Sequence, residues 1–289
     1  MKTRFPAAAI LTVTVAIATA APPSTLHRAR QLYRNTDYRA ALALLEPGKS
    51  RDPETLLLAG QAAYGLGQPK QASDYLEKAA ALDPRNPAIH HWLGRSYGRR
   101  AETASFLTAP GLASKCRREF EQAVDLGHSP GNLEAMADLM EYYLEAPGFL
   151  GGGRDKAAAM ANRIAQADPA EGEFAWARIA EKDKNLPEAE KHWRRAVELE
   201  PDKPERIADL ARFLARNGRF DESDAQFDKA LRIAPDKPAL WFARAETWIE
   251  SSRNPEPARR LLELYIASHA LTPDDPPRDQ ARRLIGKIK

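Results

Sequence analysis

The chain has 289 residues, and its 43 lysines and arginines against 40 aspartates and glutamates give a formal net charge of +3. This even balance does not favour nucleic acid or anionic lipid as the partner. Cys116 is the only cysteine, which excludes an intramolecular disulfide, so the fold must be held together by packing.

The first 20 residues have the features of a secretory signal peptide. Lys2 and Arg4 precede an apolar run from about Ala7 to Ala18, and the small side chains of Ala18 and Ala20 fit a cleavage site. The apolar run is shorter than the ~20 residues that a membrane span requires. We therefore expect cleavage after Ala20, no membrane span in the mature chain, and a periplasmic or secreted protein. An uncleaved anchor is the alternative.

A repeat of helical segments is the strongest pattern in the rest of the chain, residues 21–289. The segments PDKPERIADLARFL, from Pro201, and PDKPALWFARAETW, from Pro235, align without gaps. The stretch from Leu210 to Pro235 carries the small residues Ala211, Gly218 and Ala230 and the aromatic residues Phe220 and Phe227. Weaker copies of the same marks occur around Tyr38, Gly60, Tyr97, Trp176 and Trp241.

These segments resemble the tetratricopeptide repeat family, whose period is about 34 residues. The resemblance implies an all-α, right-handed superhelical solenoid of about seven helix–turn–helix repeats. The final residues, PPRDQARRLIGKIK, are expected to form a C-terminal capping helix that covers the last apolar face. Prolines and capping side chains, as in Asp52-Pro53 and Asn86-Pro87, predict where helices begin.

Two repeats exceed the regular length, and both insertions are expected as enlarged turns between paired helices, near residues 101–115 and 147–154. The second, EAPGFLGGGRDK, is rich in glycine as phosphate-binding loops are. Gly151 and Gly153 fit the first two positions of a dinucleotide fingerprint, but Lys156 occupies the third and no strand precedes them. We therefore expect a bend with an apolar tip at Phe149 and Leu150. This tip either folds back on the solenoid edge or forms an exposed knob for a partner.

No residue pattern indicates catalysis or a metal site. The six histidines lack the helical spacing of a zinc motif, and the adjacent His90 and His91 diverge by about 100° on a helix. Cys116 occupies a position where other repeats have a small residue, so a buried, unreactive thiol is expected. We expect a protein that is not an enzyme and that binds no cofactor or metal.

The resemblance also implies a concave groove lined by the first helix of each pair. The residues expected to point into it are Tyr64, His91, Arg95, Arg99, Glu141, Glu145, Phe174, Arg178, Arg212, Arg216, Phe242, Glu246 and Glu250. The alternative is that many of them form only a solvated helix face.

The charges of this groove alternate in sign from repeat to repeat. Four like-charge pairs at i,i+4 spacing, such as Arg95 with Arg99, oppose helix stability by a few tenths of a kcal/mol each. This mosaic favours a mixed-charge protein segment as the ligand, since a polyanion such as nucleic acid would be repelled by the acidic stretches. We expect reversal of both arginine charges to weaken partner binding and to leave the melting temperature nearly unchanged.

The sequence therefore predicts a non-catalytic scaffold that mediates protein–protein interactions in the periplasm or cell envelope and takes part in complex assembly. The alternative function is a small-molecule-binding accessory component of a transport system. A closed central pore with convergent polar groups would favour this alternative.

Overall fold

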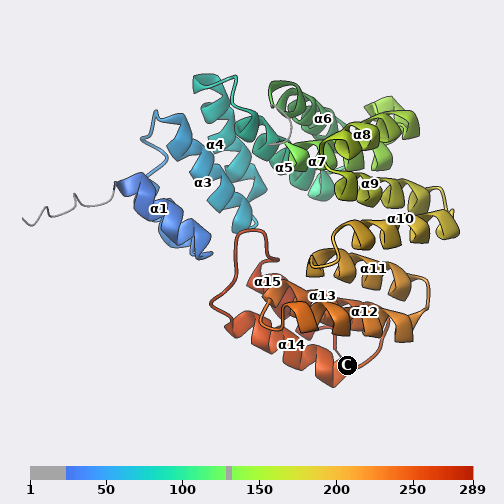
Figure 1. Ribbon diagram of the computed structural model, residues 1–289. Helices are drawn as coiled ribbons and strands as arrows, with labels where there is room; N and C mark the ends of the chain where they lie inside the picture. Colours follow the sequence, from blue (N-terminus) through green and yellow to red (C-terminus); the bar gives the residue numbers. More distant parts are fainter. Residues whose placement is uncertain (1–23, 128–131, 289) are drawn as a thin grey trace, which may run out of the picture.

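The computed structural model describes residues 24–127 and 132–288, shown in Figure 1. The expected signal peptide and its cleavage site after Ala20 lie outside these residues. The described chain is all-helical, with seven consecutive pairs of α helices followed by one more helix, α15. This confirms the predicted all-α solenoid of seven repeats with a C-terminal helix.

The first helices of the pairs are α1 (Thr25–Arg34), α3 (Pro53–Gly65), α5 (Pro87–Thr103), α7 (Leu133–Glu145), α9 (Pro169–Lys182), α11 (Pro204–Arg216) and α13 (Pro238–Glu250). The second helices are α2 (Tyr38–Leu45), α4 (Pro69–Leu82), α6 (Ala109–Leu126), α8 (Arg154–Ala167), α10 (Leu186–Leu199), α12 (Phe220–Ile233) and α14 (Pro255–Ala267). The final helix α15 spans Arg278–Ile285.

The helix starts follow the predicted chemistry. Seven helices begin at a proline, where the missing N–H group costs no hydrogen bond. The side chains of Asp52, Asn86 and Asp168 accept hydrogen bonds from backbone N–H groups in the first turns of α3, α5 and α9. Local sequence therefore sets the positions at which the chain reverses.

Pairs of helices approach closely where the repeat places a glycine. Gly60 and Gly94 occupy the same position in successive repeats, and a Cβ atom at either would lie 2.5 Å from a side-chain carbon of Leu76 or Phe120. Each glycine thus lets the large side chain of the second helix lie directly on the backbone of the first. The small residue on the first helix and the large residue on the second helix of a repeat therefore contact each other.

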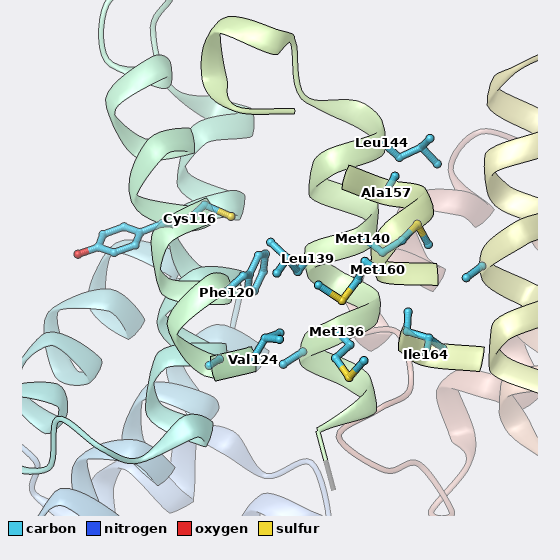
Figure 2. Close-up of a cluster of buried hydrophobic side chains, with 14 of the residues drawn as sticks. Cys116, Phe120, Val124, Met136, Leu139, Met140, Leu144, Ala157, Met160 and Ile164 are labelled. Carbon is cyan, nitrogen blue, oxygen red and sulfur yellow. The ribbon is translucent and has the colours of Figure 1, made fainter. Parts of the chain in front are cut away.

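The core continues from pair to pair. Figure 2 shows part of it, where Phe120 of α6 lies opposite Leu139 of α7, and Met140, on the other side of α7, continues the cluster with Met160 and Ile164 of α8. Cys116 belongs to this cluster and is buried, as predicted, and burial raises the pKa of its thiol to about 12. A thiol with so high a pKa stays protonated at neutral pH and is a poor nucleophile.

The extra residues of the third repeat are mostly helical. They lengthen α5 to 17 residues and α6 to 18, so that only residues 104–108 connect the two helices. In the fourth repeat a short 3₁₀ helix, η1 (Gly148–Leu150), and Gly151–Gly153 join α7 to α8. The two insertions therefore differ in structure: one extends the helices and the other forms an irregular turn.

The glycine turn uses its own backbone donors internally. The N–H of Gly151 donates to the carbonyl of Gly148 at 2.9 Å, that of Gly152 to Pro147 at 3.2 Å, and that of Gly153 to Tyr143 at 2.8 Å. Lys156 also donates to the Gly151 carbonyl at 2.8 Å. A phosphate cradle needs such N–H groups free and convergent, so this geometry supports a bend.

Candidate functional site

The solenoid curls until its end meets its beginning. Figure 1 shows the segment between α14 and α15 extending from the last repeat to the end of α3. The guanidinium group of Arg278 donates to the Thr36 hydroxyl of the first repeat at 2.9 Å, and to the carbonyls of Ile266 at 3.0 Å and Ser268 at 2.7 Å. We call Thr36, Tyr38, residues 65–67 and residues 271–278 the closing seam. The chain thus forms a closed ring, with α15 inside it.

The first helices line this ring and are joined by charged side chains. Arg178 of α9 contacts Glu141 of α7 at 2.8 Å, and Lys182 contacts Glu145 at 2.6 Å along the same pair of helices. We call the whole series the ion ladder, which consists of Arg95–Asp138, Glu141–Arg178, Glu145–Lys182, Glu181–Arg216 and Arg212–Glu246. The ladder joins five successive first helices, from α5 to α13.

The ladder corrects one expectation from the sequence. The like-charge pairs Glu141/Glu145 and Arg212/Arg216 do not require a partner to neutralise them, because the neighbouring helices present opposite charges at hydrogen-bonding or ion-pair distance. The hydrogen bond with Glu141 raises the pKa of the half-buried Arg178 above its ordinary value. The alternation of charge sign therefore produces ion pairs between the first helices of successive repeats.

Arg95 and His91 also contact other side chains of the same chain. The guanidinium group of Arg95 lies 4.7 Å from the centre of the Trp92 ring and 5.7 Å from that of Tyr64, with Asp138 at 3.5 Å. His91 is buried, and its Nε2 atom lies 2.8 Å from the same aspartate. Tyr64 and Arg95 are half-buried on the inner side, whereas His91 is wrongly predicted as an open groove residue.

The two predicted groove phenylalanines have different surroundings. Phe174 is half-buried, meets the Trp193 ring edge-on at 5.0 Å and lies under the guanidinium group of Arg206. Phe242, at the equivalent repeat position, is only 1% exposed and packs against Tyr265 of α14 at a ring-centre distance of 5.1 Å. The prediction that Phe242 points into the groove is therefore wrong, because this side chain is buried in the core between α13 and α14.

A hollow on the inner surface lies where α11, α13 and α15 meet the end of α5. It contains two cavities, of about 560 and 590 Å³, that share Glu246 and Glu250 and that we call together the chamber. The remaining charged residues of the chamber are Arg99, Arg212, Arg216, Arg283 and Lys287. The chamber thus combines predicted groove residues with side chains of α15 that the sequence did not suggest.

The apolar tip of the fourth repeat is exposed. Phe149 is 83% exposed and Leu150 is half-buried, so of the two alternatives Phe149 fits the exposed knob and not a tip folded back on the solenoid edge. Two further apolar side chains, Phe106 at 83% and Leu107 at 76%, project from the connection in the third repeat. Apart from their place in an insertion, no sequence signal marks these two.

Neither a metal cluster nor a membrane-spanning helix occurs in the described part of the chain. Among residues 24–127 and 132–288, no group of three or more histidine, cysteine or acidic side chains is arranged to hold a metal ion. No helix in these two ranges combines the length and the apolar character needed to cross a bilayer.

Comparisons with known proteins agree with the geometry. Residues 53–96 and 180–245 each match a family model described as a tetratricopeptide repeat. The structure is similar to a tetratricopeptide repeat protein from Thermus thermophilus, with a TM-score of 0.53 and 23% identity over 66% of this chain and 97% of that one. It is also similar to one from Parabacteroides merdae, with a TM-score of 0.57 and 14% identity over 91% and 97%. No curated protein matches the sequence.

Proposed function

We propose that this chain, which contains tetratricopeptide repeats, is a non-catalytic scaffold that binds a protein partner in the periplasm or cell envelope during complex assembly. Repeat solenoids of this kind generally serve as binding surfaces. The observation that carries the proposal is the exposure of Phe106, Leu107 and Phe149. The location rests on the sequence of the first 20 residues alone.

These three side chains are more exposed than any other large apolar side chain of the described residues. The next, Leu264 on α14, is 54% exposed. All three belong to the insertions that depart from the repeat period, so the period does not account for them. The insertions are also neighbours, because η1 packs against α6 and Gly151 lies against the side chain of Arg117. Aromatic anchors of this kind commonly dominate protein interfaces.

The inner surface supports a protein ligand less well. Its cations and carboxylates from α5 to α13 are already joined in the ion ladder, and a ligand would have to replace these contacts. Replacing a formed ion pair gains little free energy, since the partner charges must be desolvated first. The exposed tips have no such competing contact.

The test is site-specific photo-cross-linking in the envelope, with the cross-linking residue placed at position 106, 149 or 264. We expect the same partner to be captured from 106 and 149 and not from 264. A triple substitution, Phe106→Ser, Leu107→Ser and Phe149→Ser, should abolish this capture, whereas Leu264→Ser should leave it intact. Equal capture by the triple variant and the wild type would contradict the proposal.

A second function is favoured by the closed ring. The chamber has the size of small-molecule sites, which occupy about 300–1,000 Å³, and it brings together polar groups of the third repeat, the last two repeats and α15. These features support a small-molecule-binding accessory component of a transport system. Native mass spectrometry of protein isolated from its own envelope tests this function, because a bound small molecule adds a defined mass.

A further inference from the structure

Three cations of the chamber remain outside the ion ladder. Arg283 and Lys287 of α15 form no ion pair with any residue that the structure describes, and Arg99 of α5 pairs only with Glu102 of its own helix, at 3.0 Å. All three line the cavity of about 590 Å³. Arginines and lysines elsewhere on the inner surface, such as Arg178 and Lys182, instead contact a carboxylate of the preceding first helix.

The carboxylates of the chamber form no ion pair with these three cations. Glu246 is turned toward Arg212, at 3.9 Å, and accepts a hydrogen bond from Gln280 at 3.4 Å. Glu250 forms no ion pair within the described part of the chain. The larger cavity has three cationic side chains, Arg99, Arg283 and Lys287, and two carboxylates, which leaves one positive charge in excess. Like charges brought together in a concave site attract an anion, because field lines concentrate there.

The walls of the chamber are partly apolar. Ile249 and Leu284 line the larger cavity together with Arg99, Arg283 and Lys287, and Phe220 lines the smaller one. A few charged groups set in an apolar wall are typical of sites for small organic ligands. Arg99 comes from α5 and the other two cations come from α15, so two anionic groups joined by an apolar body would match them.

We propose that the chamber binds a small organic dianion, with carboxylates at both ends of an apolar chain, between Arg99 and the pair Arg283/Lys287. This inference rests on the second function above. Guanidinium groups hold carboxylates by two parallel hydrogen bonds, and the ammonium group of Lys287 adds a point charge. Ile249 and Leu284 contact the apolar body.

The probes are succinate, adipate and suberate, each tested by calorimetry and by thermal unfolding of the full mature protein at low ionic strength. We expect at least one of them to raise the melting temperature by about 5 °C at 100 times its Kd. Octanoate, which matches suberate with one carboxylate fewer, and inorganic phosphate should each bind at least about tenfold more weakly.

The variants separate a specific site from general attraction. Arg283→Gln with Lys287→Gln, and Arg99→Gln alone, should each weaken dicarboxylate binding about tenfold or more. Arg282→Gln removes the same charge from an exposed, neighbouring position on α15 that pairs with Asp279, and it should have almost no effect. All four side chains are largely exposed, so circular dichroism should show the variants folded.

Three results would overturn the inference: no dicarboxylate binds the wild type, octanoate binds as tightly as suberate, or Arg282→Gln weakens binding as much as Arg283→Gln. The second function has a separate test. If a neutral or cationic molecule accompanies the native protein and is lost from the Arg99→Gln variant, that function stands and the dianion proposal fails. If dicarboxylates bind as expected, both are supported.

Discussion

The inner surface of the fourth to sixth repeats and the inner surface at α15 use the same residue types in opposite ways. From α7 to α11, Glu141, Glu145 and Glu181 each contact a cation of the next first helix. Around α15, Arg283 and Lys287 have no such neighbour among the described residues. A charged side chain on the inner surface therefore stabilises the fold where the next repeat presents the opposite charge. Beyond the last repeat no such partner follows, and the charge is available to bind a ligand.

The largest effect should come from reversing a charge within the ion ladder. Arg178→Glu places a third carboxylate between Glu141 and Glu181, which lie 2.8 and 3.1 Å from the arginine. We expect it to lower the free energy of unfolding by about 3 kcal/mol. The matched reversal at the chamber, Arg283→Glu, should change it by less than about 0.5 kcal/mol. Urea unfolding followed by circular dichroism measures both, and equal effects would remove the distinction between the two regions.

A smaller effect is expected at the closing seam. Arg278→Ala removes three hydrogen bonds, two of which satisfy the carbonyls of Ile266 and Ser268 near the end of α14. We expect a loss of about 2 kcal/mol. We also expect faster hydrogen exchange in residues 268–278 and a larger radius of gyration by X-ray scattering. Thr36→Val removes only the bond that crosses the seam, so it should open the ring at a lower cost in stability. An unchanged radius in both variants would show that other contacts close the ring.

The fold could be predicted because the residues of each repeat specify how its own two helices pack. Gly60 and Gly94, with Leu76 and Phe120 on the paired helices, specify the closest contacts within the repeat period, and prolines mark the helix starts. The sequence of a single repeat does not predict whether the solenoid closes into a ring, because closure depends on the summed rotation of all repeats. The seam residues 271–278 follow no repeat pattern, so their contact with Thr36 had no sequence signal.

The candidate site was only partly predictable for the same reason. Most inward positions were found from the period, but Asp138, Glu181 and Lys182 were missed, although they complete the ladder. Ladder partners such as Glu181 and Arg216 lie about one repeat apart in the chain, a spacing that a search for opposite charges would have found. Phe242 was misplaced because equivalent repeat positions do not have equivalent neighbours, and Tyr265 covers only this one.

The smallest effect separates two arginines of α5 that the sequence treated alike. Arg95 lies over the rings of Trp92 and Tyr64 and near Asp138, so Arg95→Ala should cost about 1 kcal/mol. Among the described residues Arg99 forms an ion pair only with the exposed Glu102, so Arg99→Ala should cost less than about 0.5 kcal/mol. Reversing both charges should therefore lower the melting temperature, contrary to the expectation from the sequence.

The two substitutions should have the opposite order of effect on ligand binding. Arg99 lines the chamber and Arg95 does not, so Arg99→Ala should weaken dicarboxylate binding while Arg95→Ala leaves it nearly unchanged. Thermal unfolding and calorimetry on the same two proteins measure both quantities. Because one residue is expected to affect stability and the other binding, overall weakening of the fold cannot produce this crossed pattern. If Arg95→Ala reduced binding as much as Arg99→Ala, the boundary between the ladder and the chamber would have to move to include both arginines.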